Sequence, residues 1–358
     1  MPPTKFLLPS QIATMTTRAT ATLLLLFTTR PFCLGFSALS FVRSTSLSSF
    51  LRRYSTASNH SDGRSLQDVL ATAERAARQA GNIIRATAGN IAISNTKANA
   101  KDLVTASDIE CQQVIENIIL EAYPDDLFLG EEHVESGSNA SRAALESALS
   151  QLTSTLLWIV DPIDGTTNFQ AGLPICCVSI GVLGRNTTTG APEILAGVIY
   201  NPILDEMVTA VQGGGAFVNG KRIQSSKAGT AVVLSSSLIN VGFPVVNEST
   251  LRASSKAVTA LSTQCRGLRM FACASQLMSW VAQDKFQSYI AWDLNAWDMA
   301  AGVLIVQEAG GCLLELKDGR PATISSRDLV VSSPSGGVML GQEILTVLRD
   351  NDCIDYSS

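Results

Sequence analysis

The chain has 358 residues, of which 46% are hydrophobic and 16% charged, with 26 basic and 31 acidic side chains. This composition favours a globular protein with one large α/β unit or two coupled units, and it argues against a fibrous or disordered chain. Residues 1–61 contain six basic and no acidic residues, so the remainder has a net charge near −11 (20 basic minus 31 acidic). That balance disfavours nucleic acid as a general partner.

The N-terminal segment resembles an organellar transit peptide, because it is rich in Arg, Ser and Thr and lacks acidic residues. The run Arg52–Thr56 resembles a mitochondrial processing site, whereas the Ser/Thr enrichment and the stretch Phe32–Phe41 also suit a plastid leader. Its apolar run Leu23–Phe27 is far shorter than the ~20 residues of a membrane span. We therefore predict a transit peptide over residues 1–57, an organellar location (mitochondrion or plastid) and no contact with a membrane.

Two amphipathic helices are expected next. Apolar residues recur every three or four positions from Ser65 to Ala88, and Gly89 can end that helix. A second helix is predicted from near Ser107 to just before Pro124, which places Asp108 at its start. The polar stretch 134–141 is expected to be an exposed loop.

The segment from Leu156 to Phe169 is the most informative one in the chain. Five apolar residues indicate a buried strand that ends near Pro162, so Asp161 and Asp164 lie where the sheet ends. Two carboxylates this close repel each other unless a cation neutralises them, and oxygen ligands favour Mg²⁺ or Mn²⁺. Gly165 then permits close approach of a ligand to the backbone, and Thr166 offers a hydroxyl. The alternative is an aspartate-rich turn that merely closes a strand.

The rest of the chain alternates strand patterns with turn signals and two helices. Gly213–Gly215 is interpreted as a hairpin turn rather than a phosphate cradle, since no helix and lysine follow it. This pattern predicts a largely antiparallel sheet and then a mixed C-terminal part, with halves at 65–235 and 236–345. Strands are expected at 176–183, 194–200, 207–211, 216–218, 222–224, 232–239, 313–316 and 329–332, and helices at 275–283 and 299–309.

The number and spacing of the cysteines and histidines limit the kinds of active site that the chain can form. Eight cysteines show no C-x-x-C spacing, so we interpret them as small buried hydrophobic residues rather than as zinc ligands. His133 is the single histidine beyond residue 61, and no Gly-x-Ser-x-Gly motif accompanies it. Carboxylate and metal chemistry is favoured by elimination.

Two more carboxylates are candidates for such a site. Asp298 precedes an apolar helical run and could simply cap that helix, and Glu131 alone could be a solvated loop residue. Together with Asp161 and Asp164, they supply enough oxygens for two hard cations ~3.5–4 Å apart.

Four sequence blocks resemble, in the same order, those of the inositol monophosphatase family. This family comprises lithium-sensitive, magnesium-dependent phosphomonoesterases related to fructose-1,6-bisphosphatase. The blocks are Lys97 with Asp102–Asp108, Gly130–Glu132, Trp158–Phe169 and Trp297–Gly302. The resemblance extends over roughly residues 66–345. It implies an α/β fold, a layered αβαβα sandwich, and a homodimer.

The resemblance also implies roles for residues. Glu131, Asp161 and the Ile163 carbonyl would bind one Mg²⁺, Asp161, Asp164 and Asp298 a second, and a third ion would lie near Glu131. Glu131 and Thr166 would orient a metal-bound water, with Asp108 behind Thr166. The backbone amides of Gly165 and Thr166 would hold phosphate, and Lys97 would lie on a loop that closes over the site.

The chain departs from the family at the substrate. Inositol-specific members carry a glutamate where this chain has Ala291, and Asp293 could substitute if it lay on an extended strand. A Gly-Thr-Ala turn of the substrate pocket is Ala272–Ala274 here, which leaves Ala274 as a candidate contact. The predicted function is Mg²⁺-dependent hydrolysis of myo-inositol monophosphate or a similar small polyol phosphate. Alternatives are a histidinol-phosphate, sugar or nucleotide 3′-phosphatase, or a noncatalytic protein-binding relative.

Overall fold

The structure is a computed structural model, and it describes residues 64–89, 95–96, 103–104, 106–224, 232–244 and 247–354. These described residues belong to one compact unit. The predicted transit peptide and Lys97 lie outside the described residues. None of the described helices is both long enough and apolar enough to span a membrane.

The larger sheet has seven strands in the order β3-β4-β5-β6-β7-β8-β9 within the described residues. β3 and β4 are parallel, and every later pair is antiparallel, so the predicted antiparallel region is confirmed. The strands are β3 (Leu127–Gly130), β4 (Leu157–Asp164), β5 (Cys177–Arg185), β6 (Pro192–Asn201), β7 (Glu206–Val211), β8 (Gly215–Val218) and β9 (Lys221–Arg222). The Gly213–Gly215 run joins β7 to β8 as a hairpin, as predicted.

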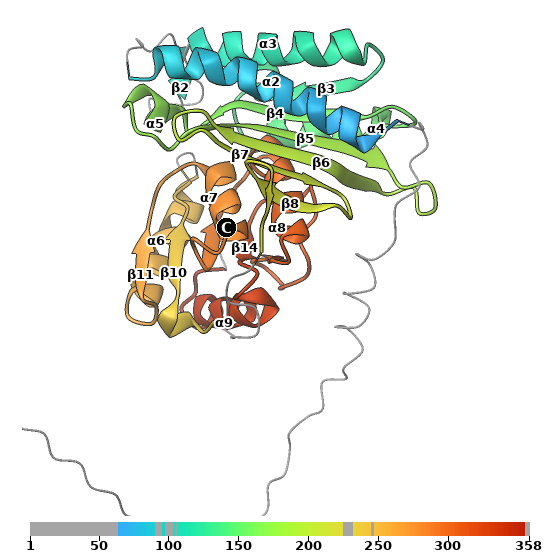
Figure 1. Cartoon of the computed structure of the whole chain (residues 1–358). Coiled ribbons are helices and arrows are strands. Elements are labelled where there is room, and N and C mark those ends of the chain that lie inside the picture. Colours follow the sequence, from blue (N-terminus) through green and yellow to red (C-terminus); the bar gives the residue numbers. More distant parts are fainter. Residues whose placement is uncertain are drawn as a thin grey trace, which may run out of the picture. The chain divides into compact units, whose positions relative to one another are not determined.

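The two N-terminal helices cover one face of this sheet (Figure 1). α2 (Leu66–Thr87) and α3 (Ala106–Ala122) agree closely with the predicted helices. The inward face of α2 is lined by Ala73, Ala76, Ala77 and Ala80, all fully buried, and these small side chains let the helix pack close to the sheet.

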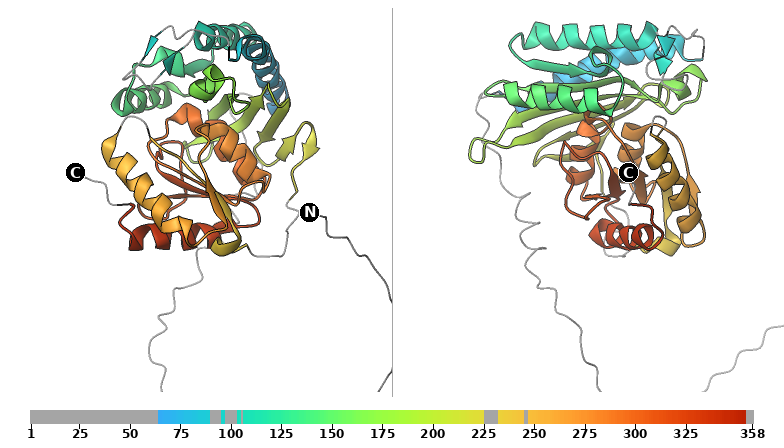
Figure 2. Two further views of the ribbon diagram at one scale, coloured as in Figure 1. Left: turned by 90° about the vertical axis from the view of Figure 1, so that its left-hand side faces the viewer. Right: turned by 180° about the vertical axis from the view of Figure 1, so that it is seen from behind.

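Two further helices separate the larger sheet from a second one (Figures 1 and 2). α7 (Ala274–Ala282) and α8 (Ala296–Glu308) share one hydrophobic cluster with residues of both sheets. Close approach of α8 to β5 and β6 depends on two glycines. A Cβ at Gly181 would lie 2.5 Å from the Ala300 Cβ, and one at Gly197 would lie 2.9 Å from the Ala301 carbonyl oxygen.

Among the residues that the structure describes, the second sheet has five strands in the order β11-β10-β12-β14-β13. α6 (Glu248–Ser262) and α9 (Gly337–Asp350) cover its outer face through a third cluster. The layers therefore run α, β, α, β, α, which confirms the predicted architecture. The strands are β10 (Leu238–Val241), β11 (Gly267–Arg269), β12 (Ser288–Ala291), β13 (Cys312–Glu315) and β14 (Leu329–Ser332), and β1 (Asn95–Thr96) pairs separately with β2 (Leu103–Val104).

Two sequence-based expectations were wrong. The predicted loop 134–141 is shortened, because α4 (Ser138–Gln151) begins at Ser138 and packs Leu145 and Leu149 into a fourth cluster. The predicted strand 232–239 instead begins with the 3-10 turn η2 (Leu234–Ser236), and the strand itself starts at Leu238. In both places local polarity or β propensity was overridden by tertiary packing.

Candidate active site

Asp161 and Asp164 are brought together by an irregularity at the end of β4. Residues three apart on a regular strand point to opposite faces. The pairing of β4 with β5 shifts register between Asp161 and Asp164, around Pro162. The backbone N–H of Ile163 donates to Asp161 Oδ1 at 3.0 Å, which closes the turn. The bulge therefore lets two consecutive carboxylates of one strand share one site.

Glu131 reaches the same site from the neighbouring strand. It opens the short turn η1 (Glu131–His133) directly after β3. Gly130 is paired with Val160 in the parallel ladder, so the next residue on each strand is an acid, Glu131 and Asp161. The register of the β3–β4 ladder therefore explains why these two acids, already candidates from the sequence, lie next to each other.

Asp298 is contributed by the first turn of α8. The backbone N–H of Asn295 donates to Asp298 Oδ2 at 2.6 Å, so part of this carboxylate does cap the helix. Two serines hold the start of the helix in place. Ser179 Oγ of β5 donates to the Trp297 carbonyl at 3.1 Å, and Ser275 Oγ of α7 donates to the Asp298 carbonyl at 3.0 Å.

The buried negative charges of this cluster favour the binding of a cation. Burial and the negative charges of Glu131, Asp164 and Asp298 raise the pKa of Asp161 well above its ordinary value. Burial likewise raises the pKa of Asp298. Burial raises the pKa of Asp164 to about 6, although hydrogen bonds from Ser275 and Ala274 oppose the shift. A hard cation would offset the unfavourable free energy of burying these negative charges, and a set of oxygen ligands suits Mg²⁺.

Thr166 lies beside the carboxylates at the start of α5 (Thr166–Gln170). Its hydroxyl lies 3.2 Å from Asp108 Oδ1 and 3.1 Å from the Ile163 carbonyl oxygen. Asp108 is 1% exposed, in the first turn of α3, as the sequence predicted. Gly165 precedes Thr166 and has a φ of +87°, which is a left-handed conformation. The neighbouring atoms also leave no room for a side chain at Gly165.

A cavity of about 310 Å³ opens over these residues. Glu131, Asp164, Thr166 and Asp298 line it together. The rest of the wall that bears on substrate choice comes from three segments: Gly242–Pro244, Ala272–Ala274 and Trp292–Asn295. The site is thus a polar floor of carboxylates with a partly apolar wall.

The predicted substrate residues Ala274 and Asp293 both line the cavity, but the backbone at Asp293 differs from the expectation. Asp293 has φ of +56° and lies beyond β12, which ends at Ala291, so the expected extension of that strand is wrong. Its carboxylate accepts hydrogen bonds from Arg327 and Ser138. Ala274 contributes its backbone N–H, which donates to Asp164 Oδ1 at 3.2 Å.

Several residues of the site were not predicted. Arg327 is 34 positions from Asp293 and lines the cavity. Trp292 is buried in the cavity wall, and its Nε1 has no hydrogen-bond partner within the part of the chain that the structure describes. Cys177 and Cys273 approach each other beside Asp164. No local sequence signal reports contacts between residues so far apart.

Comparison with known proteins agrees with this geometry. The family model of the inositol monophosphatase family matches residues 65–349. The chain belongs to the inositol monophosphatase family. An inositol monophosphatase of Mesembryanthemum crystallinum is 36% identical over 272 residues, which cover 75% of this chain and 93% of that protein. The fold of this chain agrees with that membership.

Two other relatives widen the comparison. The Nus factor SuhB of Haemophilus influenzae is 32% identical over 288 residues, which cover 79% of this chain and 97% of that protein. The solved Thermotoga maritima IMPase superposes with a TM-score of 0.64 at 28% identity, covering 80% of this chain and 98% of that one. The family therefore includes proteins named for different functions, and membership supports a phosphatase without selecting its substrate.

Proposed function

We propose that this protein is a Mg²⁺-dependent phosphomonoesterase that hydrolyses inositol monophosphate or a similar small polyol phosphate. The observation that carries the proposal is the convergence of Glu131, Asp161, Asp164 and Asp298 beside a cavity, with the pKa values of the three aspartates raised by burial. Such a cluster is costly in a folded protein unless cations neutralise it. An aspartate-rich turn that merely closed a strand would not recruit acids from β3 and α8.

The donor set fits hard cations. Glu131, Asp161 and the Ile163 carbonyl would hold one Mg²⁺, and Asp161, Asp164 and Asp298 a second, with a third ion possible near Glu131. Bound there, Mg²⁺ lowers the pKa of a coordinated water and offsets negative charge on the phosphate. The fold presents these oxygens from three rigid elements, so little reorganisation is needed when a cation binds.

Thr166 and Asp108 would position the attacking water. When the Thr166 hydroxyl donates to Asp108, its oxygen lone pairs stay available to accept a hydrogen bond from water. Glu131 provides a second acceptor at the cavity surface. The water oxygen then bonds to phosphorus as the ester P–O bond breaks, and the products are an alcohol and inorganic phosphate. The amides of Gly165 and Thr166 would hold phosphate oxygens.

The part of the cavity near Ala291 and Asp293, which would hold the alcohol of the substrate, does not present a free carboxylate from these two positions. Ala291 offers no acceptor, and the Asp293 carboxylate already accepts from Arg327 and Ser138. The Trp292 indole N–H has no hydrogen-bond partner among the described residues, but its nitrogen is buried and so offers a substrate hydroxyl no accessible donor. The flanking Phe243 and Pro244 favour a substrate with some apolar surface, such as a histidinol or nucleotide phosphate, as the second candidate.

The deciding experiment is a phosphate-release assay with the full chain on inositol, histidinol, sugar and nucleotide phosphates, with and without Mg²⁺ and Li⁺. Mg²⁺-dependent, Li⁺-inhibited turnover of inositol monophosphate supports the proposal. Preference for another ester reassigns the substrate and keeps the chemistry. Absence of turnover on every ester favours a noncatalytic protein-binding role.

Two further properties are proposed with this function. A leader over residues 1–57 would direct the protein to a mitochondrion or plastid, which a fluorescent fusion with and without these residues would test. A homodimer is the expected assembly, and light scattering coupled to size exclusion would measure its mass.

A further inference from the structure

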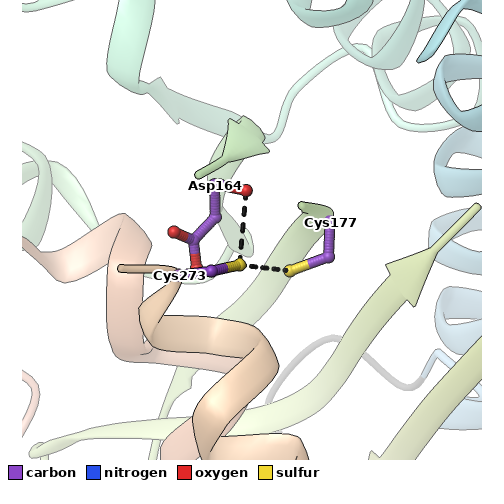
Figure 3. Close-up of side chains that lie close together, drawn as sticks. All are labelled: Asp164, Cys177 and Cys273. Carbon is purple, nitrogen blue, oxygen red and sulfur yellow. Dashed lines mark hydrogen bonds between the residues drawn. The ribbon is translucent and has the colours of Figure 1, made fainter. Parts of the chain in front are cut away.

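Two buried thiols lie next to the carboxylate cluster (Figure 3). Cys177 is the first residue of β5, and Cys273 immediately precedes α7. Their sulfur atoms are 3.7 Å apart, although the residues are separated by 96 positions. Cys273 Sγ also lies 3.4 Å from the Asp164 carbonyl oxygen. Both side chains are almost completely buried, at 0% and 1% exposure.

A carboxylate oxygen of Asp164 completes a compact set of ligands. The two sulfurs and this oxygen all lie within 4.8 Å of one another. Among the described residues, this is the set of three potential metal ligands that meets that limit. We propose that Asp164, Cys177 and Cys273 form a second metal site, which binds a soft divalent cation of the Zn²⁺ or Cd²⁺ class.

The geometry supports a tetrahedral site. Zinc–sulfur bonds are about 2.3 Å long, so two thiolates on one tetrahedral ion lie about 3.75 Å apart. The observed 3.7 Å matches this separation without any movement of β5 or of the start of α7, which carry the thiols. Thiolates prefer soft and borderline cations to Mg²⁺. Sulfur ligands thus separate this site chemically from the all-oxygen cluster, even though Asp164 belongs to both.

The cation has a route to these ligands. Cys273 and Asp164 line the 310 Å³ cavity, so an ion can enter from solvent, and a water can occupy the fourth position. Each thiol must lose its proton when the ion binds, and solvent buffer takes up both protons. The resulting site combines two thiolates and one carboxylate with one divalent cation.

Binding there would compete for Asp164. A soft cation that engages the Asp164 carboxylate withdraws it from the proposed Mg²⁺ ligands, so the cation would inhibit hydrolysis. This consequence rests on the proposed function, whereas the binding itself does not.

The test is a titration of the reduced, metal-free full chain with Cd²⁺ at pH 7.5, followed by thiolate-to-cadmium charge-transfer absorption and by proton release with a pH indicator. We expect one Cd²⁺ and two released protons per site, and at least a tenfold weaker affinity in each of C177S and C273T. The matched control is C312S, which removes a buried thiol from β13, outside the site. Absence of the absorption band, or its persistence in the double variant C177S/C273T, would overturn the proposal.

Folding and activity are read separately. Circular dichroism tests whether C177S and C273T are folded. If C273T is unfolded, the comparison uses C177S and C177A. With Mg²⁺ present, Cd²⁺ should inhibit the wild type at lower concentration than it inhibits C177S. If no ester is hydrolysed, the proposed function fails while the Cd²⁺ titration still tests this site. If hydrolysis is present and Cd²⁺ does not bind, this site alone is refuted.

Discussion

Arg327 and Asp293 form an ion pair of 2.8 Å in the wall of the cavity, where both side chains are less than one-fifth exposed. Arg327 also donates to Ser141 of α4 and to Asn295, which precedes α8. The pair therefore connects α4 to the start of the helix that carries Asp298. We expect Asp293→Ala to lower the free energy of unfolding by about 2–4 kcal/mol, because it leaves a largely buried guanidinium without its partner.

Urea unfolding of Asp293→Ala checks this value. Ser138→Ala is the control, since it removes one hydroxyl donor to Asp293 and should cost only about 1 kcal/mol. Equal losses for the two variants would contradict an ion pair that stabilises this wall.

Asp161→Asn should abolish turnover while the protein stays folded. The substitution keeps the shape of the side chain and removes a charge that repels Glu131, Asp164 and Asp298 in the absence of metal. We expect kcat/KM to fall by at least about 100-fold and calorimetric Mg²⁺ affinity to fall with it. Asp125→Asn, at an exposed turn, is the control. Retained turnover in Asp161→Asn would remove this residue from the chemistry.

Thr166→Val should lower kcat by roughly 100-fold, because valine keeps the volume but cannot donate to Asp108 or accept from water. Thr166→Ser keeps the hydroxyl and should stay within about tenfold of the wild type. Steady-state kinetics on the best ester distinguishes the two. Similar rates for valine and serine would mean that the hydroxyl plays no part.

Gly165→Ala should destabilise the protein more than Gly213→Ala does. Both glycines have positive φ, +87° and +72°, so alanine costs about 1–2 kcal/mol in each. Only at Gly165 would the added Cβ also collide, 2.8 Å from the Ile175 carbonyl oxygen, whereas nothing lies within 4 Å at Gly213. Thermal unfolding of the two variants measures the difference, and an equal loss would show that the collision is relieved.

The metal-free protein should become less stable as pH rises. The pKa of Asp164 is about 6 in the folded protein and 3.8 ordinarily, so the folded state binds more protons between these values. Stability therefore falls as pH rises through this window, by up to ~3 kcal/mol from Asp164, and the contribution of Asp164 then levels off.

Asp164→Asn isolates this contribution. In EDTA, the unfolding temperature of the variant minus that of the wild type should grow from pH 5 to pH 7.5. Mg²⁺ should reduce the gap by stabilising the wild type. A gap that does not vary with pH would exclude an ionising Asp164 as the cause.

Much of this protein was predictable because its signals are local. The helix at 66–87 follows from apolar spacing, and the carboxylates at Asp161 and Asp164 follow a run of five apolar residues that can only be a buried strand in this context. The layered fold was predicted from the resemblance of four ordered blocks. The four carboxylates were grouped from their residue types, and the resemblance then implied their individual roles, although residues 131 and 298 are far apart in sequence.

Only the tertiary structure decided which distant side chains meet. Strand alternation predicted that Asp293 would face the position of Ala291, but the left-handed turn at Asp293 directs its carboxylate to Arg327 instead. The cysteines were interpreted from their spacing as small buried residues, and they are buried in the described chain, except for half-buried Cys265. That spacing could not reveal the contact of Cys177 with Cys273, because the packing of α7 against β5 creates it. Sequence alone thus predicted the local elements and the candidate acids, while long-range packing determined the cavity wall and the sulfur pair.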